Sequence, residues 1–212
     1  MQLKRLYIKE FKLFKDFTYE FPADSKRYIH VLIGINGSGK STILEAIAEI
    51  FSCVILGEKA KFGFELEYSF KQNFVDFPAD YRGFIPPPLG VYIGAEKDSK
   101  PKMLLNYNNL GNYSEVPKMS NYQDFIPKNI VIYYSGYSEI MKEMCIPHNN
   151  QMLDNYIKGI TKQSNQFYYY EPKLFNLILI SLLSYEYGDV PVFLREKAKI
   201  SGDRKSTRLN SS

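Results

Sequence analysis

Residues 2–21 carry two sets of apolar positions with the spacing of β-strands. The first set is Leu3, Leu6, Ile8 and Phe11, and the second, which alternates with polar residues, is Phe17, Tyr19 and Phe21. Alternation with a period of two places apolar side chains on one face of a strand. We therefore expect two strands joined by a tight connection, followed by a turn over residues 22–26.

Residues 28–33, Tyr-Ile-His-Val-Leu-Ile, form a short, β-branched and mostly apolar run. Such a run predicts a buried strand. Residues 41–51 instead repeat their apolar positions at helical spacing and predict a helix. A strand, a glycine-rich loop and a helix are thus expected in direct succession.

Three short strand-like runs follow at residues 62–70, 90–95 and 101–107, the last two separated by a polar turn. Three consecutive prolines at 86–88 predict a surface loop. Residues 108–128, rich in Asn, Ser, Gly and Pro, predict a long exposed loop.

Residues 129–135 predict a strand that joins a parallel core sheet. From Tyr137 onward the pattern is helical, with expected breaks at Pro147 and Pro172. The clearest late helix covers residues 172–187; it is apolar on most sides, so we expect it to be buried. This order of strands and helices predicts an α/β fold.

Composition is ordinary for a globular protein of one domain: 212 residues, 45% hydrophobic and 24% charged. No apolar run is long enough to cross a membrane, and no signal peptide is visible at the N-terminus. Cys53 and Cys145 lack metal-binding spacing and are interpreted as reduced core thiols. We therefore expect a cytoplasmic protein without a membrane partner.

Residues 203–212, Asp-Arg-Lys-Ser-Thr-Arg-Leu-Asn-Ser-Ser, look like the translation of a sequencing-adapter oligonucleotide. We interpret them as an artefact and expect the natural protein to continue beyond Gly202. Three basic residues and one acidic residue lie in this tail, so the net charge falls from +4 to +2 without it. A net charge this small does not by itself indicate a nucleic-acid surface.

Residues 34–41, between the expected strand and the expected helix, match G-x-x-x-x-G-K-[ST], the phosphate-binding P-loop or Walker A motif. Its glycines let backbone N–H groups turn inward, and the positive end of the following helix attracts phosphate. The motif assigns Lys40 to the β- and γ-phosphates, Ser41 to Mg²⁺, and a further N–H of Thr42 to the α-phosphate. The expected nucleotide-binding residues are Gly34, Asn36, Gly37, Ser38, Gly39, Lys40, Ser41 and Thr42. The expected metal ligand is Ser41, and the expected cofactors are ATP and Mg²⁺.

Residues 6–17 precede this loop and contain the pattern I-x-x-F-x-x-F, from Ile8 to Phe14. Together with Asn36 in the loop, this beginning resembles an ABC-type ATPase head among the AAA family ATPases. It is more narrowly similar to the SMC and DNA-repair branch. Bacterial anti-phage and restriction-associated ATPases have a similar N-terminal beginning. The resemblance covers residues 1 to about 56.

The resemblance implies an ABC/SMC-head-like P-loop NTPase fold, present here as an incomplete N-terminal part over residues 1–202. Residues 1–135 would form an α/β lobe with an antiparallel β-meander over 61–111, and residues 136–202 a helical segment. The resemblance also implies ATP hydrolysis in the complete protein and a head-to-head homodimer that sandwiches ATP. Its conformational cycle would act on DNA or on a partner nuclease.

A complete head needs an apolar strand that ends in Asp-Glu, where Asp holds Mg²⁺ and Glu activates water. Residues 167–171 end in Glu171 without the Asp, and residues 177–183 have no acid at their end. No Leu-Ser-Gly-Gly-like signature occurs, and residues 135–139 only faintly resemble one. The catalytic residues are therefore unknown, and we expect this chain by itself not to turn over ATP.

Two other classes stay open: a small nucleoside or nucleotide kinase, and a module that binds nucleotide without hydrolysis. Such kinases carry an arginine-rich lid, whereas only four arginines precede the tail, which argues against a kinase. Residues 80–83 match the D-x-x-G of GTPases but end no apolar strand, so we expect a surface turn. Lys12, where related heads carry a basic residue near the nucleotide, is interpreted as a solvated lysine, and His30 as a packed core histidine.

Overall fold

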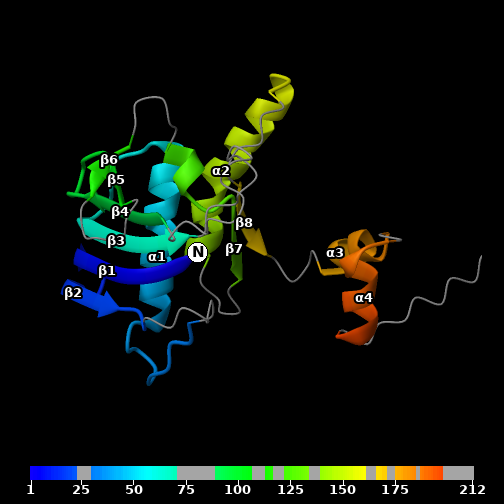
Figure 1. Cartoon of the computed structure of the whole chain (residues 1–212), viewed down its shortest axis with the longest axis horizontal. Coiled ribbons are helices and arrows are strands. Elements are labelled where there is room, and N and C mark those ends of the chain that lie inside the picture. The colour runs from blue at the N-terminus through cyan, green and yellow to red at the C-terminus, as the bar shows by residue number, and fades with distance from the viewer. Residues whose placement is uncertain are drawn as a thin grey trace, which may run out of the picture. The chain divides into compact units, whose positions relative to one another are not determined.

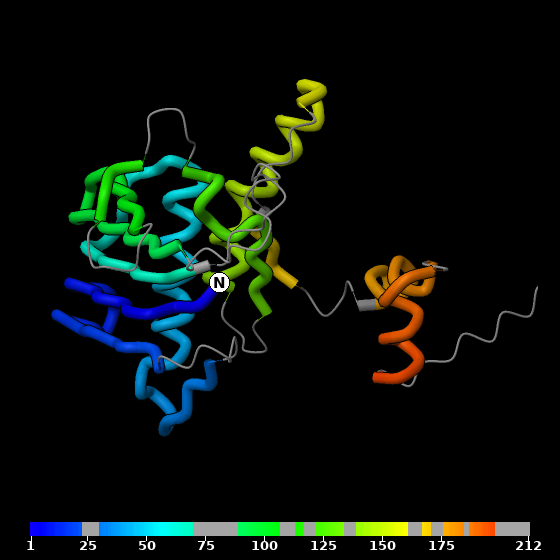
Figure 2. Tube along the Cα trace, in the orientation of Figure 1, coloured from blue at the N-terminus to red at the C-terminus, as the bar shows by residue number. Residues whose placement is uncertain are grey.

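The computed structural model describes residues 1–22, 30–70, 89–106, 113–116, 122–133, 139–160, 166–170, 175–184 and 187–197. The chain divides into two units, residues 1–169 and 170–212 (Figures 1 and 2). The boundary expected at residue 135 stays a prediction.

A six-stranded sheet forms the body of the first unit, and each pair of neighbouring strands in it is antiparallel (Figure 1). Its order is β2-β1-β3-β4-β5-β6. The strands are β1 (Gln2–Phe11), β2 (Phe14–Glu20), β3 (Phe64–Phe70), β4 (Leu89–Ala95), β5 (Lys102–Asn106) and β6 (Ser114–Glu115). The two expected N-terminal strands and the expected antiparallel meander are confirmed.

One face of this sheet is apolar and is covered by helix α1 (Lys40–Leu56), as Figure 1 shows. Leu6, Leu66 and Val91 on this face have no exposed surface. The ring of Phe51 on α1 lies 5.7 Å from that of Tyr68 on β3, measured between centroids. Because α1 is buried along most of its length, its N-terminal end is fixed by the core of the unit.

A shift in the β1–β3 pairing between Leu3 and Arg5 explains why the apolar spacing in β1 is three residues at that point. Leu3 is paired with Tyr68, whereas Arg5 is paired with Glu67. An extra residue in one strand changes which face the following side chains occupy. Leu3 and Leu6 therefore both pack with the core, while Arg5 contacts carboxylates on the polar face.

The strand expected at residues 28–33 is not found where the structure describes it. Residues 30–35 form no strand, and Val31 and Ile33 are 72% and 92% exposed. Tyr28 and Ile29 lie outside the described residues. A strand needs a neighbour that pairs with its backbone and covers its side chains, and no described strand pairs with residues 30–35.

Strand β7 (Asn129–Tyr133) exists as expected, but it does not join a parallel core sheet. It pairs with β8 (Gln166–Tyr170) in a separate two-stranded sheet. Ile130 and Ile132 pack against the core, whereas Val131 and Tyr133 are 65% and 62% exposed. Half of its apolar positions thus face away from the core, which distinguishes it from a central strand with both faces covered.

Helix α2 (Ile140–Ile157) continues through Pro147, so the break expected there is wrong. A proline inside a helix costs about 3 kcal/mol because it removes one backbone hydrogen bond and crowds the preceding turn. Met141, Met144, Cys145 and His148 are buried on one face. Their burial on both sides of the proline offsets this cost.

The second unit contains α3 (Phe175–Leu183) and α4 (Asp189–Glu196). The helix expected over 172–187 is shorter, and the expectation that it is buried is wrong, because Leu177 and Ile180 are each 64% exposed. Helix α3 has nine residues and is apolar on most sides. Helix α4, with eight residues, offers too little surface to cover it.

The segment 108–128 is not a uniformly exposed loop in its described parts. It contributes β6 and a short 3₁₀ helix (Tyr122–Phe125), and Ile126 after that helix is buried. The hydroxyl of Tyr68 donates a hydrogen bond of 2.6 Å to the carbonyl of Phe125. The proline triplet 86–88, the D-x-x-G segment 80–83, Pro172 and Ser135 lie outside the described residues.

Candidate nucleotide-binding site

The glycine-rich loop turns directly into α1. Gly37 and Gly39 have φ angles of 82° and 91°, a region that side chains with a Cβ atom rarely adopt. Gly39 is the N-cap of α1, and it supplies no side-chain hydrogen bond to the helix. A long hydrogen bond of 3.3 Å from the Ser38 N–H to the Ile35 carbonyl closes the loop. The sequence at this point therefore forms a glycine turn with an open helix end.

The side chain of Lys40 folds back over the loop. Its Nζ donates hydrogen bonds of 2.7 Å to the carbonyls of Gly34 and of Ile35, and lies 3.4 Å from the Ser38 hydroxyl oxygen. These partners carry no net charge, so they form no ion pair with the Lys40 amine. An anion entering the loop would meet both the charge of this amine and the end of the helix.

The N-terminal end of α1 is suited to anions. The first N–H groups of any α-helix lack partners within the helix, and the helix dipole places partial positive charge there. The first turn of α1 contains no acidic residue that would neutralise this charge. Ser41 is exposed, whereas Thr42 is only 8% exposed. The Ser41 hydroxyl is therefore open to a ligand, while Thr42 offers mainly its backbone.

Two acids further along α1 are largely buried and neutralised. The side chains of Glu45 and Glu49 are each 11% exposed. Lys12 pairs with Glu45 at 2.5 Å, and Lys61 pairs with Glu49 at 2.6 Å. The Lys12 side chain is 40% exposed, as the interpretation of a solvated hairpin lysine expects, but its amine is also paired with a carboxylate on the helix that begins at the loop.

The turn between β1 and β2 lies against the loop. An added Cβ on Gly39 would come within 2.6 Å of Cζ of Phe14 and 3.3 Å of Cδ1 of Leu13. Phe14 itself is buried and stacks on Phe17, with ring centroids 4.1 Å apart. Gly39 is thus required both by its φ angle and by the closeness of this hairpin.

A buried polar contact links the second half of α1 to α2. The Ser52 hydroxyl and Nε2 of His148 are 2.8 Å apart, and the imidazole stacks on Phe167 with centroids 4.5 Å apart. Burial lowers the pKa of His148 from its usual 6.5 to about 4. Because this histidine is neutral near pH 7 and packed, it is a structural group.

His30 differs from the packed core histidine that the sequence predicts. It is half-buried, and its ring meets that of Phe21 edge-on with centroids 5.2 Å apart. Its Nε2 is buried without a hydrogen-bond partner.

Cys53 and Cys145 are free and buried, which confirms the expectation of unbonded core thiols. Burial raises the pKa of each thiol to about 11. Neither is therefore a thiolate near neutral pH, and neither is suited to nucleophilic chemistry.

Metal ligands do not cluster in the part of the chain that the structure describes. Among those residues, no three His, Cys, Asp or Glu side chains lie together as a metal-binding group. The Ser41 hydroxyl is the one group that the loop motif assigns to a metal. A single hydroxyl holds Mg²⁺ weakly, but Mg²⁺ that accompanies a nucleotide takes most of its ligands from phosphate and water.

The structure gathers all eight sequence-predicted binding residues, from Gly34 to Thr42, in one loop and the helix turn that follows it. What sequence reasoning missed is the hairpin turn, whose Lys12 contacts Glu45 and whose Phe14 contacts Gly39. The basic position of Lys12 was the one available signal, but its partner lies 33 residues away.

The described part of the chain is thus a mixed α/β structure in which a glycine loop enters an uncapped helix and a lysine amine folds over that loop. The sequence matches the AAA ATPase domain family over residues 1–186. Since this match spans most of the chain, the chain belongs to that family, which suggests a nucleotide-binding ATPase. No curated protein matches the chain. Among the described residues, no helix is both long and apolar enough to cross a bilayer.

Proposed function

We propose that this chain binds Mg-ATP through residues 34–42, as the nucleotide-binding part of an ABC/SMC-like ATPase head. The observation that carries the proposal is the Lys40 amine, held 2.7 Å from two loop carbonyls beside the uncapped end of α1. Membership of the AAA ATPase domain family supports ATP as the nucleotide.

Binding would replace neutral contacts by charged ones. Lys40 would exchange its bonds to the Gly34 and Ile35 carbonyls for bonds to phosphate oxygens, which are stronger because the acceptor is charged. The N–H groups of the first helical turn would donate to the same phosphates. The exposed Ser41 hydroxyl would hold Mg²⁺, which neutralises phosphate charge when bound.

We further propose that hydrolysis belongs to a complete head-to-head dimer that acts on DNA or on a nuclease. This rests on the N-terminal hairpin and on Asn36 in the loop, which resemble the SMC and DNA-repair branch. Turnover needs an Asp for the metal and a Glu for the water. No apolar strand in this sequence ends in that pair, so we expect this chain by itself to release no phosphate.

The test is calorimetric titration of the chain with Mg-ATP, for the parent and for Lys40→Ala. We expect the variant to bind roughly tenfold more weakly or worse, because hydrogen bonds to charged groups are lost. The urea midpoint should stay close to that of the parent, since the described contacts of Lys40 lie within its own loop.

Lys9→Ala is the matched control. It removes the same charge from β1, where Lys9 forms an exposed pair with Glu96 at 3.0 Å, and should bind like the parent. Equal ATP affinity in Lys40→Ala and the parent contradicts the proposed site. Equal weakening in both variants shows that only net charge attracts the nucleotide.

A further inference from the structure

The turn between β1 and β2 has a backbone conformation that its sequence does not favour. Phe11 pairs with Phe14, so Lys12 and Leu13 alone form the turn. Lys12 has a φ of 54°, in the left-handed region. A residue with a Cβ atom costs about 1 kcal/mol or more there, whereas glycine does not. Strain of this kind persists where the surrounding structure holds the residue in place, and it clusters at functional sites.

The Lys12 side chain has an evident use. Its Nζ lies 2.5 Å and 2.7 Å from the two carboxylate oxygens of Glu45, and 5.8 Å from the centroid of the Phe11 ring. Glu45 follows Lys40 by five residues, which is about 7.5 Å along the helix axis. An unpaired carboxylate at that distance would lie within a Debye length of any phosphate in the loop and repel it.

The same turn contacts the loop by packing. A Cβ atom on Gly39 would lie 2.6 Å from the Phe14 ring and 3.3 Å from the Leu13 side chain. Gly39 is the N-cap of α1 and lies next to Lys40. The hairpin tip therefore holds the start of α1 at two points, by an ion pair on one side and by apolar contact on the other.

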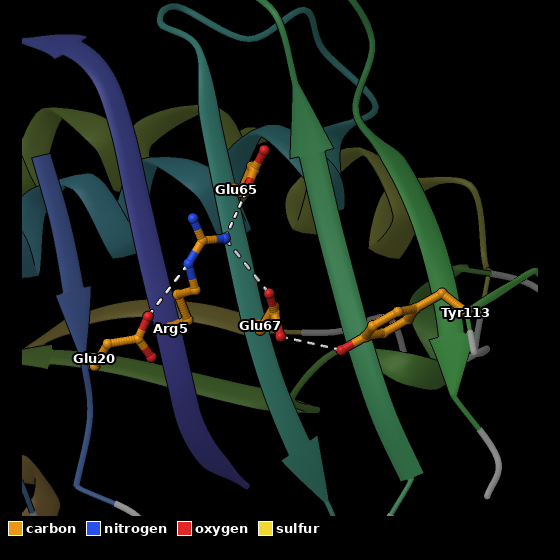
Figure 3. Close-up of polar contacts among 5 residues, drawn as sticks. All are labelled: Arg5, Glu20, Glu65, Glu67 and Tyr113. Carbon is orange, nitrogen blue, oxygen red and sulfur yellow. Dashed lines mark hydrogen bonds and ion pairs between the residues drawn. The ribbon is translucent and has the colours of Figure 1, made fainter. Parts of the chain in front are cut away.

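The other end of the hairpin is anchored to the sheet. Arg5 on β1 contacts Glu20 on β2 at 3.4 Å, and Glu65 and Glu67 on β3 at 2.6 Å and 3.5 Å (Figure 3). The Tyr113 hydroxyl donates to Glu67 at 3.1 Å. The hydrogen bond to Glu65 and the surrounding carboxylates raise the pKa of Arg5, so it stays charged. These contacts cross-link β2, β1 and β3 at the end of the hairpin away from its tip.

We propose that Lys12 is a positioning residue of the nucleotide site: by pairing with Glu45 it holds the hairpin tip on Gly39 and fixes the loop in its receptive shape. Its relevance to nucleotide rests on the proposed function, but the fixing of the loop does not.

The first measurement is deuterium exchange of the chain without nucleotide, in peptides that cover residues 36–45. In Lys12→Gly, exchange should rise roughly tenfold, the loss expected for a bond between charged groups. Exchange in β3 and β4 should stay at the parent rate. The urea midpoint should also stay close to that of the parent, because glycine relieves the strained φ while the ion pair is lost.

Rescue separates positioning from simple damage. Lys12→Arg, and the exchanged pair Lys12→Glu with Glu45→Lys, should return the exchange rate to within roughly twofold of the parent. Lys9→Ala, on strand β1 of the same hairpin, should change nothing. Unaltered exchange over 36–45 in Lys12→Gly overturns the proposal, and so does a rise that extends equally to β3 and β4 or that neither rescue reverses.

The second measurement is Mg-ATP affinity by calorimetry for the same variants. Lys12→Gly should bind roughly tenfold more weakly at an unchanged urea midpoint, and Lys12→Arg should bind like the parent. If the parent binds no ATP, the proposed function fails while the exchange data still decide whether Lys12 holds the loop. If the parent binds and Lys12→Gly binds equally, the positioning role is refuted and the proposed function stands.

Discussion

Acidification should weaken the fold through one buried histidine. His148 on α2 is 6% exposed, lies 2.8 Å from the Ser52 hydroxyl and stacks on Phe167. Burial lowers its pKa to about 4 in the folded protein, against about 6.5 in an unfolded chain. Between these two values the unfolded chain binds more protons, so stability falls as the pH falls.

The magnitude follows from the two pKa values. The contribution of His148 is fully present above about pH 6.5 and declines as the pH falls toward about 4. At about pH 5 the loss amounts to about 2 kcal/mol, and at full protonation of both states to about 3 kcal/mol. A loss of this size is a large fraction of the stability of an ordinary domain.

The assay is urea unfolding of the parent and of His148→Gln at about pH 7.5 and about pH 5. Glutamine can still hydrogen-bond to Ser52 but does not take up a proton. Comparing the two proteins cancels the other titrating groups, so the parent should lose about 2 kcal/mol more than the variant between the two pH values. Parallel pH profiles for the two proteins would refute the reasoning.

Three further substitutions test the core and the loop. Gly39→Ala should lower ATP affinity roughly tenfold or more, because an added Cβ would lie 2.6 Å from Phe14 and the φ of Gly39 is 91°. An unchanged Mg-ATP affinity by calorimetry would contradict this. Leu66→Ala, at a position with no exposed surface, should lower the free energy of unfolding in urea by about 3 kcal/mol. Tyr68→Phe should lower it by about 1–2 kcal/mol, because the partly buried Phe125 carbonyl loses a hydrogen bond; an unchanged urea midpoint would mean that water replaces that bond.

The local elements and the loop were predictable from the sequence because their causes are local. Alternating apolar residues specify β1–β5, helical spacing specifies α1, and the glycines specify the turn before Lys40. The identity and position of all eight proposed nucleotide-binding residues follow from one motif. Even the three-residue spacing of Leu3 and Leu6 was visible, although the register shift that it requires was not.

Only the tertiary structure decided which elements meet. The apolar run at 30–33 predicted a buried strand, yet Val31 and Ile33 are exposed because no described strand pairs with them. Strand β7 was predictable as a strand, but its pairing with β8 was not. Pairing depends on segments far apart in the chain, and local propensity carries no information about them.

The same reason explains why the ion pair of Lys12 was not predicted. A lysine in an exposed hairpin turn is normally solvated, and nothing near it in the sequence indicates otherwise. Its partner Glu45 lies on a helix that the sheet holds beneath the turn. The sequence by itself determined the glycine loop and the charge that Lys40 brings to it. The packing of the β1–β2 hairpin on α1 decided what surrounds that loop, because a contact across 33 residues exists only once the core has formed.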